Sequence, residues 1–276
     1  MLKRTLSGAV FVAVIVGFFF LREYVDIRLF NILVYFFSLV GTFEVWRALK
    51  NSEAFGGALG GRAGAAAGAI IAACALAFVP ISTFFGLKWG TVVLVLGGAG
   101  AVLARAFSKE NFGFNAGVCL LPVIYPNALL CGMIAANAYG ENALLALLLI
   151  FVTSPLADTF AYLVGSLIGG RKLCPSVSPN KTVSGAIGGL VGGAAGALAL
   201  YFIFTPELPL GWLIFLAIGL FAALFTELGD LFESWLKRRA GVKDMGKIMP
   251  GHGGVMDRID GISFCAVFVA LVFLAL

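Results

Sequence analysis

The acidic residues near the end of the chain are the side chains best suited to chemistry. Of the 14 Asp and Glu residues, six lie between positions 227 and 260. Glu227, Asp230 and Ser234 are spaced three and four residues apart, which places them on one face of a helix. Asp257 and Asp260 share a helical face in the same way. Carboxylates in apolar segments are costly, and two converging acidic pairs favour a functional site over ion pairs that only orient helices.

These acids suggest metal-assisted phosphate chemistry. Carboxylates that meet at one level suit a hard divalent cation, and Mg²⁺ prefers one or two carboxylates with waters and substrate phosphates. The stretch between the acidic pairs is basic and then rich in glycine, so it offers phosphate partners and exposed backbone N–H groups. Basic residues at a membrane edge can be topology anchors alone, but this leaves the acids and glycines unexplained. The stretch contains Lys237, Arg238, Arg239, Lys243, Asp244, Pro250, His252, Gly253 and Gly254.

A second polar group lies upstream of these residues. Asp158 falls within an apolar segment, and its simplest alternative role is a hydrogen bond to a neighbouring helix. Ser178 and Pro179 are expected to open a turn, after which Lys181 and Thr182 begin a helix whose start could hold an anion. An ordinary capped helix start is the alternative for this segment. Both groups are expected on the same side of a membrane, so they can face one cavity.

The elements that must position these residues are membrane helices. Hydrophobic residues make up 61% of the 276 residues and charged residues only 12%, where a soluble domain would have about a quarter. The apolar runs are continuous, which favours helices over a barrel. The sequence therefore predicts an all-α, polytopic membrane bundle of about nine transmembrane helices. The expected spans are Leu6–Leu21, Leu29–Leu49, Gly64–Phe85, Trp89–Phe107, Phe114–Ala136, Ala143–Ile168, Thr182–Phe204, Leu210–Trp235 and Ile259–Leu276.

The distribution of basic residues predicts the orientation. With nine spans and a cytoplasmic N-terminus, sixteen of the 19 Lys and Arg residues fall in cytoplasmic segments. We therefore expect a multi-pass protein of the cell's inner (plasma) membrane, with its N-terminus and site loops in the cytoplasm. The chain is expected to form one integral membrane domain, 1–276. Residues 1–140 would supply N-terminal membrane helices, and residues 141–276 the catalytic helices and loops.

Other sequence features bear on packing. Rows of small residues at four-residue spacing let membrane helices approach closely; packing within one subunit is the favoured interpretation and a dimer face the alternative. Glu44, deep in the second span, is expected to pair with Arg47 across one turn. Pro122 and Pro126 are expected to kink the fifth span. The rows are Gly56, Gly60, Gly64 and Gly68, and Gly185, Gly189 and Gly193.

The stretch Ser234–Asp260, SWLKRRAGVKDMGKIMPGHGGVMDRID, resembles the signature of the phosphatidate cytidylyltransferases (CDP-diacylglycerol synthases). Upstream, Gly229–Ser234 and the segment from Asp158 to Tyr162 are similar to the family as well. SPNKTVSG is similar to the family's SP-x-KT motif, with Ser184 in the place of a usual glutamate. The matching signature positions are Ser234, Lys237, Arg238, Lys243, Asp244, Gly246, Pro250, His252, Gly253, Gly254, Asp257, Arg258 and Asp260.

The resemblance implies an Mg²⁺-dependent nucleotidyltransferase of phospholipid biosynthesis. Members of this family make CDP-diacylglycerol and pyrophosphate from CTP and phosphatidic acid, and form homodimers. Asp230, Asp257 and Asp260 would hold Mg²⁺, with a second metal ion as an open alternative, and Asp158 and Lys237 would join them in catalysis. The expected partners are CTP, phosphatidic acid, the lipid bilayer and a second copy of the chain, and no nucleic acid. The expected substrate-binding residues are Ser178, Lys181, Thr182, Ser234, Arg238, Lys243, Asp244, His252, Gly253, Gly254 and Arg258.

Two other functions are compatible with acids in membrane helices. A cation or proton transporter would use Asp158, Asp230 and Asp257 to line a pathway, but the chain shows no related halves. A CDP-alcohol phosphotransferase would need a D-G-x-x-A-R core. Here Asp260 and Gly261 continue into an apolar run, so that match fails.

Overall fold

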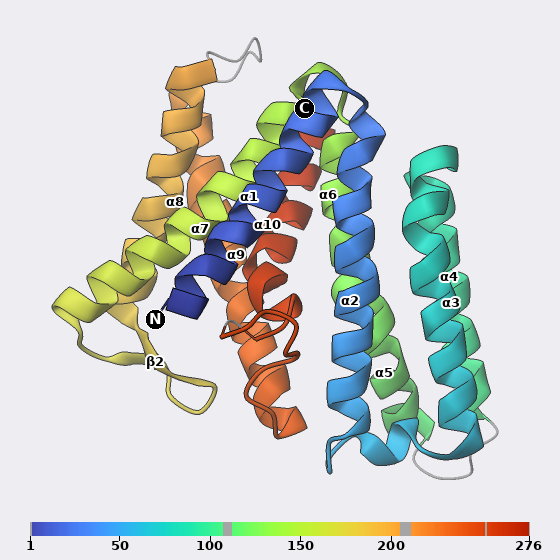
Figure 1. Cartoon of the computed structure of the whole chain (residues 1–276). Helices are drawn as coiled ribbons and strands as arrows, with labels where there is room; N and C mark the ends of the chain where they lie inside the picture. Colours follow the sequence, from blue (N-terminus) through green and yellow to red (C-terminus); the bar gives the residue numbers. More distant parts are fainter. Residues whose placement is uncertain (1, 107–111, 205–210, 252, 276) are drawn as a thin grey trace. The chain divides into compact units, whose positions relative to one another are not determined.

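Helices account for nearly all of the described chain. The computed structural model describes residues 2–106, 112–204, 211–251 and 253–275 (Figure 1). Within these residues, nine helical spans are long and apolar enough to cross a membrane, by length and composition. The predicted all-α, polytopic bundle is confirmed. Helices α5 and α6 together form one of these spans, Phe112–Asn137. The α-helices are α1 (Leu2–Tyr24), α2 (Phe30–Lys50), α3 (Gly61–Phe85), α4 (Leu87–Ala106), α5 (Phe112–Val123), α6 (Leu129–Asn137), α7 (Ala143–Ile168), α8 (Val183–Phe204), α9 (Trp212–Ala240) and α10 (Met256–Ala275).

The chain divides into two compact units. The first unit consists of Met1–Ile134 and Lys237–Arg258, and the second of Ala135–Leu236 and Ile259–Leu276. Helices α9 and α10 therefore each run from one unit into the other. The loop that joins them, residues 241–255, belongs to the first unit and is called the basic loop below. The division of the sequence at residue 140 stays a prediction.

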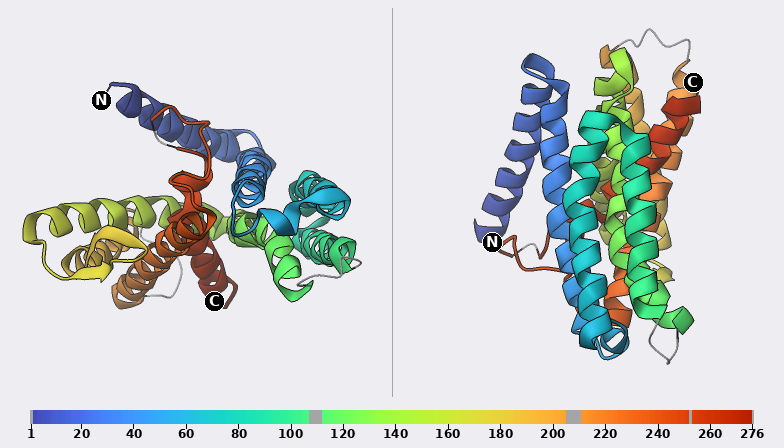
Figure 2. Two further views of the ribbon diagram at one scale, coloured as in Figure 1. Left: turned by 90° about the horizontal axis from the view of Figure 1, so that it is seen from below. Right: turned by 90° about the vertical axis from the view of Figure 1, so that its right-hand side faces the viewer.

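Small residues bring the helices of the first unit close together. Helices α3 and α4 run side by side in Figure 1 and in the right-hand view of Figure 2. A Cβ added at Gly97 of α4 would lie 2.6 Å from the sulfur of Cys74 of α3. A Cβ at Gly68 of α3 would lie 3.1 Å from Nε1 of Trp46 of α2. The missing side chains let Cys74 and Trp46 pack directly against the glycine backbones.

The fifth span breaks where its prolines predicted a kink. A π-helical segment, Ile124–Ala128, separates α5 from α6, and Tyr125 within it has non-helical angles (φ −107°, ψ 88°). The buried amide of Asn127 donates to the carbonyl of Pro122 (3.2 Å) and to Oγ1 of Thr42 on α2 (2.8 Å). A kink leaves backbone groups without their helical hydrogen-bond partners, and inside a membrane these groups need other partners. The side chain of Asn127 supplies a donor to the carbonyl of Pro122.

Helix α8 packs closely on two helices of the second unit. A Cβ at Gly192 would lie 2.7 Å from Cβ of Phe160 on α7, and one at Gly193 would lie 2.5 Å from Cβ of Ala223 on α9. A Cβ at Gly185 would lie 2.8 Å from the carbonyl oxygen of Ala161, and one at Gly189 would lie 3.2 Å from that of Ala157, both on α7. The row of glycines in α8 thus serves packing within one subunit, the interpretation that the sequence favoured.

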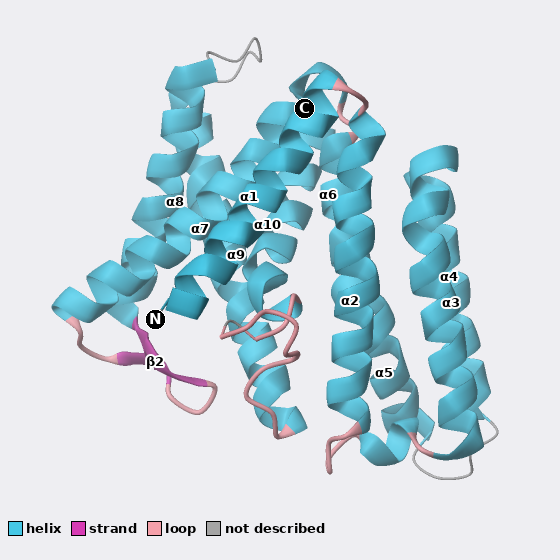
Figure 3. Cartoon of the chain, viewed as in Figure 1, coloured by secondary structure: helices cyan, strands magenta, loops and turns pink. Residues whose placement is uncertain are grey.

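The sequence did not predict the short β-hairpin that precedes α8. Strands β1 (Lys172–Cys174) and β2 (Ser178–Thr182) pair antiparallel (Figure 3, magenta). Ser178 was expected in a turn and Lys181 and Thr182 at a helix start, but all three lie in β2 and α8 begins at Val183. The two strands are stabilised by hydrogen bonds to each other, which local turn signals do not reveal.

Two helix ends beside the basic loop differ from the expected spans. Helix α9 continues to Ala240, beyond the predicted end at Trp235, so that Lys237, Arg238 and Arg239 lie in its last turn. Basic side chains at a helix C-terminus are favoured by the helix dipole. Helix α10 begins at Met256, three residues before the predicted start, and its first turn contains Asp257.

Candidate functional site

An acidic cleft of about 430 Å³ opens in the second unit. Asp158 of α7, Lys181 of β2, and Glu227 and Asp230 of α9 contribute the charged side chains of its wall. The sequence predicted that Asp158 and Lys181 can face one cavity with the acidic and basic residues near the C-terminus. Of these, Glu227 and Asp230 line the same cleft as Asp158 and Lys181, and a cavity shared with the other residues stays a prediction.

Lys181 is held between two carboxylates of α9. Its Nζ lies 2.7 Å from Oδ2 of Asp230 and 3.0 Å from Oε2 of Glu227. Burial lowers the pKa of Lys181, but the carboxylates of Asp230 and Glu227 outweigh burial and raise the pKa above the ordinary lysine value. The ammonium group therefore keeps its charge at neutral pH. Glu227 is the better shielded acid, with 8% of its side chain exposed against 33% for Asp230.

Negative charge exceeds positive charge in this cleft. Asp158 interacts electrostatically with Glu227, Asp230 and Asp260, and with the single cation of Lys181. Among the described residues, no three His, Cys, Asp or Glu side chains are arranged to hold a metal ion by themselves. A divalent cation in the cleft would complete its coordination with water and substrate oxygens, which is the usual coordination of Mg²⁺. The donor set thus fits Mg²⁺ bound together with a phosphate.

Two smaller side chains complete the surroundings of the cleft. Oγ of Ser234 donates to Oδ1 of Asp230 over 3.5 Å. Oγ1 of Thr182 accepts a hydrogen bond from the backbone N–H of Gly185 at 3.1 Å, so it caps the start of α8. This is the capped helix start that the sequence offered as an alternative. The role of Thr182 in substrate binding stays a prediction.

Ser184 follows the SP-x-KT motif, at the position where the resembling family usually has a glutamate. Its hydrogen-bond partners belong to the hairpin and to the end of α7. Its hydroxyl donates to the carbonyl of Gly169, at the end of α7. It also lies 3.1 Å from Oγ1 of Thr182. Ser184 therefore ties the hairpin to the helices on either side of it. The carboxylates beside Lys181 come from Asp230 and Glu227 of α9.

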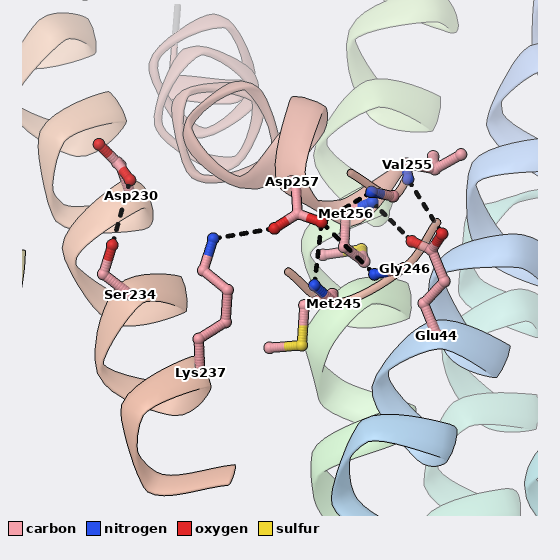
Figure 4. A network of polar contacts seen from close by, with 10 residues as sticks. Glu44, Asp230, Ser234, Lys237, Met245, Gly246, Val255, Met256 and Asp257 are labelled. Carbon is pink, nitrogen blue, oxygen red and sulfur yellow. Dashed lines mark hydrogen bonds and ion pairs between the residues drawn. The ribbon is translucent and has the colours of Figure 1, made fainter. Parts of the chain in front are cut away.

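Asp257 is the central acceptor of the first unit. Oδ1 accepts from Nζ of Lys237 at 2.9 Å, and Oδ2 accepts from the backbone N–H groups of Met245 (2.9 Å), Gly246 (3.4 Å) and Gly254 (2.8 Å) (Figure 4). Only 2% of its side chain is exposed. Its charge is thus balanced by Lys237 and its oxygens are used by the basic loop. Its predicted role as a metal ligand stays a prediction.

Glu44 of α2 also holds the basic loop. Its Oε1 accepts from the N–H of Val255 at 3.1 Å, and its Oε2 from the N–H of Met256 at 3.0 Å (Figure 4). The sequence suggested a local pair with Arg47, but the carboxylate binds backbone groups more than two hundred positions away. A glutamate in the middle of an apolar helix was the available signal, and its partner could not be read from the sequence.

The basic loop forms a second cleft, of about 470 Å³, in the first unit. Lys243, Lys247 and Arg258 give it three positive charges, and Asp244 gives one negative charge. Gly251 and Gly253 adopt positive φ (80° and 83°), which favours glycine there. Such turns aim backbone N–H groups at anions, and basic side chains add charge-assisted hydrogen bonds. His252 lies outside the described residues.

The predicted site residues thus fall into two groups. The second unit contains Asp158, Lys181, Thr182, Asp230, Ser234 and Asp260. The first unit contains Lys237, Lys243, Asp244, Gly253, Gly254, Asp257 and Arg258. Ser178 and Arg238 line neither of the two clefts. The sequence grouped Glu227 with Asp230 on one helical face but assigned it no role, and it left Glu44 out of the site.

Among the described residues, nine spans that are long and apolar enough to cross a membrane, together with two clefts lined by charged side chains, define a polytopic membrane protein. A family model described as the cytidylyltransferase family matches residues 2–276, and this chain belongs to that family.

Curated relatives carry a more specific name. A phosphatidate cytidylyltransferase of Staphylococcus aureus (strain COL) is 42% identical over 160 residues, which cover 57% of this chain and 59% of that protein. One of Staphylococcus haemolyticus (strain JCSC1435) is 39% identical over 158 residues, with the same shares. One of Bacillus subtilis (strain 168) is 46% identical over 112 residues, 41% of each chain. The matched region thus spans less than two thirds of the length of these relatives.

Proposed function

We propose that this chain is a phosphatidate cytidylyltransferase. It would transfer CMP from CTP to phosphatidic acid, giving CDP-diacylglycerol and pyrophosphate, with Mg²⁺ as cofactor. The observation that carries the proposal is the cleft in which Lys181 is held by Glu227 and Asp230 beside Asp158. A cation and several carboxylates in one cleft suit a phosphate and the metal ion that accompanies it. Membership of the cytidylyltransferase family and the names of the relatives support the same activity.

The reaction requires positioning and charge stabilisation rather than a protein nucleophile. An ionised phosphate oxygen of phosphatidic acid would attack the α-phosphorus of CTP. A new P–O bond forms as the bond from the α-phosphorus to the bridging oxygen breaks, and pyrophosphate leaves with the electron pair. Bound Mg²⁺ supplies neutralisation of the triphosphate and of the leaving group.

The residues of the acidic cleft would act on the metal and on one phosphate. Asp230 and Asp260, with Asp158 beside them, are the carboxylates that would hold Mg²⁺. Lys181 would bind a phosphate oxygen while its carboxylate partners keep the ammonium group charged and oriented. Asp257 is proposed as a third metal ligand only through the resemblance, because its oxygens serve the basic loop in this structure.

The basic loop would bind the phosphates of the nucleotide. Lys243, Lys247 and Arg258 surround its cleft, where they can neutralise the charge that builds up on the leaving pyrophosphate. Lys237 is held by Asp257 at 2.9 Å, which orients its ammonium group.

The cellular setting is proposed on the same basis. CTP is a soluble nucleotide and phosphatidic acid is a membrane lipid, so the site belongs at the cytoplasmic face of the inner membrane. The excess of basic residues in the expected cytoplasmic segments supports that orientation. A homodimer is proposed from the family resemblance.

The test is a reconstitution with defined substrates. The detergent-purified chain is supplied with CTP, phosphatidic acid and Mg²⁺, and CDP-diacylglycerol is measured by mass spectrometry. Product is expected with CTP, and none when the metal is chelated or when ATP or GTP replaces CTP. A monodisperse, helical preparation that makes no CDP-diacylglycerol would refute the proposed function.

A further inference from the structure

Glu44 has no role in the proposed chemistry, but its carboxylate binds the end of the basic loop directly. It lies in the middle of α2 and only 2% of it is exposed. Its carboxylate accepts the backbone N–H groups of Val255 and Met256, where the basic loop ends and α10 begins. A carboxylate at a helix N-terminus is favoured by unpaired N–H groups and by the helix dipole.

Glu44 and Asp257 divide the backbone of the loop between them. Asp257 accepts from Met245, Gly246 and Gly254, and Glu44 from the next two residues along the chain. The middle of the loop and its C-terminal end are therefore held by buried carboxylates. Because one of these carboxylates comes from α2, the loop is held against a helix that is distant in the sequence.

Two glycines make the approach of Glu44 possible. A Cβ at Gly246 or at Gly254 would collide with the carboxylate of Glu44. The loop can reach Glu44 only because both positions lack a side chain. Both glycines belong to the signature stretch, whereas Glu44 lies far upstream of it.

We infer that Glu44 is a positioning residue that preorganises the basic loop to bind the phosphates of a nucleoside triphosphate. This inference rests on the proposed function and adds to it a residue from the N-terminal half. By holding Val255 and Met256, Glu44 fixes the position of the last residue of the loop and of the first turn of α10, which contains Arg258. A loop that is already ordered loses less entropy when the nucleotide binds, so affinity for CTP depends on Glu44.

The key variant is Glu44→Gln, which keeps the shape of the side chain. Glutamine offers one acceptor oxygen, and its NH₂ group faces a backbone N–H that the carboxylate accepted before. We expect KM for CTP to rise about tenfold, from the loss of one charge-assisted hydrogen bond. KM for phosphatidic acid should stay the same and kcat should change less than threefold. Glu44→Asp keeps the charge on a shorter side chain and should recover part of the CTP affinity.

A matched control separates positioning from general destabilisation. Thr42→Val changes another buried polar residue of α2, whose hydroxyl is bonded to Asn127 rather than to the basic loop. It should lower the melting temperature without changing KM for CTP. A merely structural role for Glu44 would predict the same pattern for Glu44→Gln.

Hydrogen exchange provides a readout that does not depend on activity. In the full-length wild-type protein, the amides of Val255 and Met256 should exchange slowly, and at least tenfold faster in Glu44→Gln. Unchanged exchange, or an unchanged KM for CTP in an active Glu44→Gln variant, would overturn the inference. If the wild-type protein makes no CDP-diacylglycerol, the proposed function fails. The exchange rates then decide by themselves whether Glu44 orders the loop.

Discussion

Each unit contains a lysine that is paired with carboxylates, but the two pairings differ in how much of the carboxylate is left open. In the second unit, Lys181 faces Glu227 and Asp230, and carboxylates outnumber the lysine at an open cleft. In the first unit, Lys237 faces Asp257, whose other oxygen is used by three backbone N–H groups. We propose that an acid–lysine pair can serve a site when acceptor capacity is left over, and that it is a structural support when this capacity is used up.

The largest effect is expected at the acidic cleft. Asp230→Asn removes a proposed metal ligand and one partner of Lys181, and should lower turnover by on the order of a thousandfold. Because the side chain is a third exposed, the melting temperature should change little. Turnover and thermal unfolding are measured on the same preparation. Near-normal turnover would show that the cleft is not the metal site.

Asp257→Asn tests the other half of the comparison. The partly buried cation of Lys237 would lose its counter-charge and three N–H groups would lose a charged acceptor, so stability should fall by about 3 kcal/mol. Thermal or denaturant unfolding in detergent measures the loss. Full stability combined with lost turnover would place Asp257 with the catalytic acids and not with the support of the loop.

Lys181→Met removes the cation and leaves the carboxylates in place. Turnover should fall about thirtyfold, as expected for a lost charge-assisted phosphate contact. The concentration of Mg²⁺ needed for half-maximal activity should fall, because the metal no longer competes with an ammonium group for Asp230. A metal titration of both proteins measures this shift. A higher requirement for Mg²⁺ would mean that Lys181 and the metal do not share this carboxylate.

The smallest effect is expected at Ser184. Ser184→Ala removes the hydroxyl that donates to Gly169 and should cost about 1 kcal/mol of stability. Turnover should stay within twofold of wild type, because Glu227 supplies the carboxylate beside Lys181. A large loss of turnover with normal stability would instead assign Ser184 to the substrate.

Much of the fold followed from composition and apolar run length. Nine spans were expected and nine are found among the described residues, since a membrane helix must be long and apolar whatever it packs against. The kink at Pro122 and Pro126 followed from local chemistry too. The hairpin at β1 and β2 did not, because three- and five-residue strands leave little pattern and depend on each other for hydrogen bonds.

The acidic residues near the C-terminus could be recognised from the sequence alone, because carboxylates in apolar helices have few explanations other than function. The spacing also placed Glu227, Asp230 and Ser234 on one face. Which carboxylate is left open and which is committed was decided only by tertiary structure. Glu44 binds amides 211 and 212 positions away, and Asp257 receives three N–H groups from a folded loop. Such hydrogen bonds depend on where the backbone passes in space, and the order of residues along the chain does not specify that.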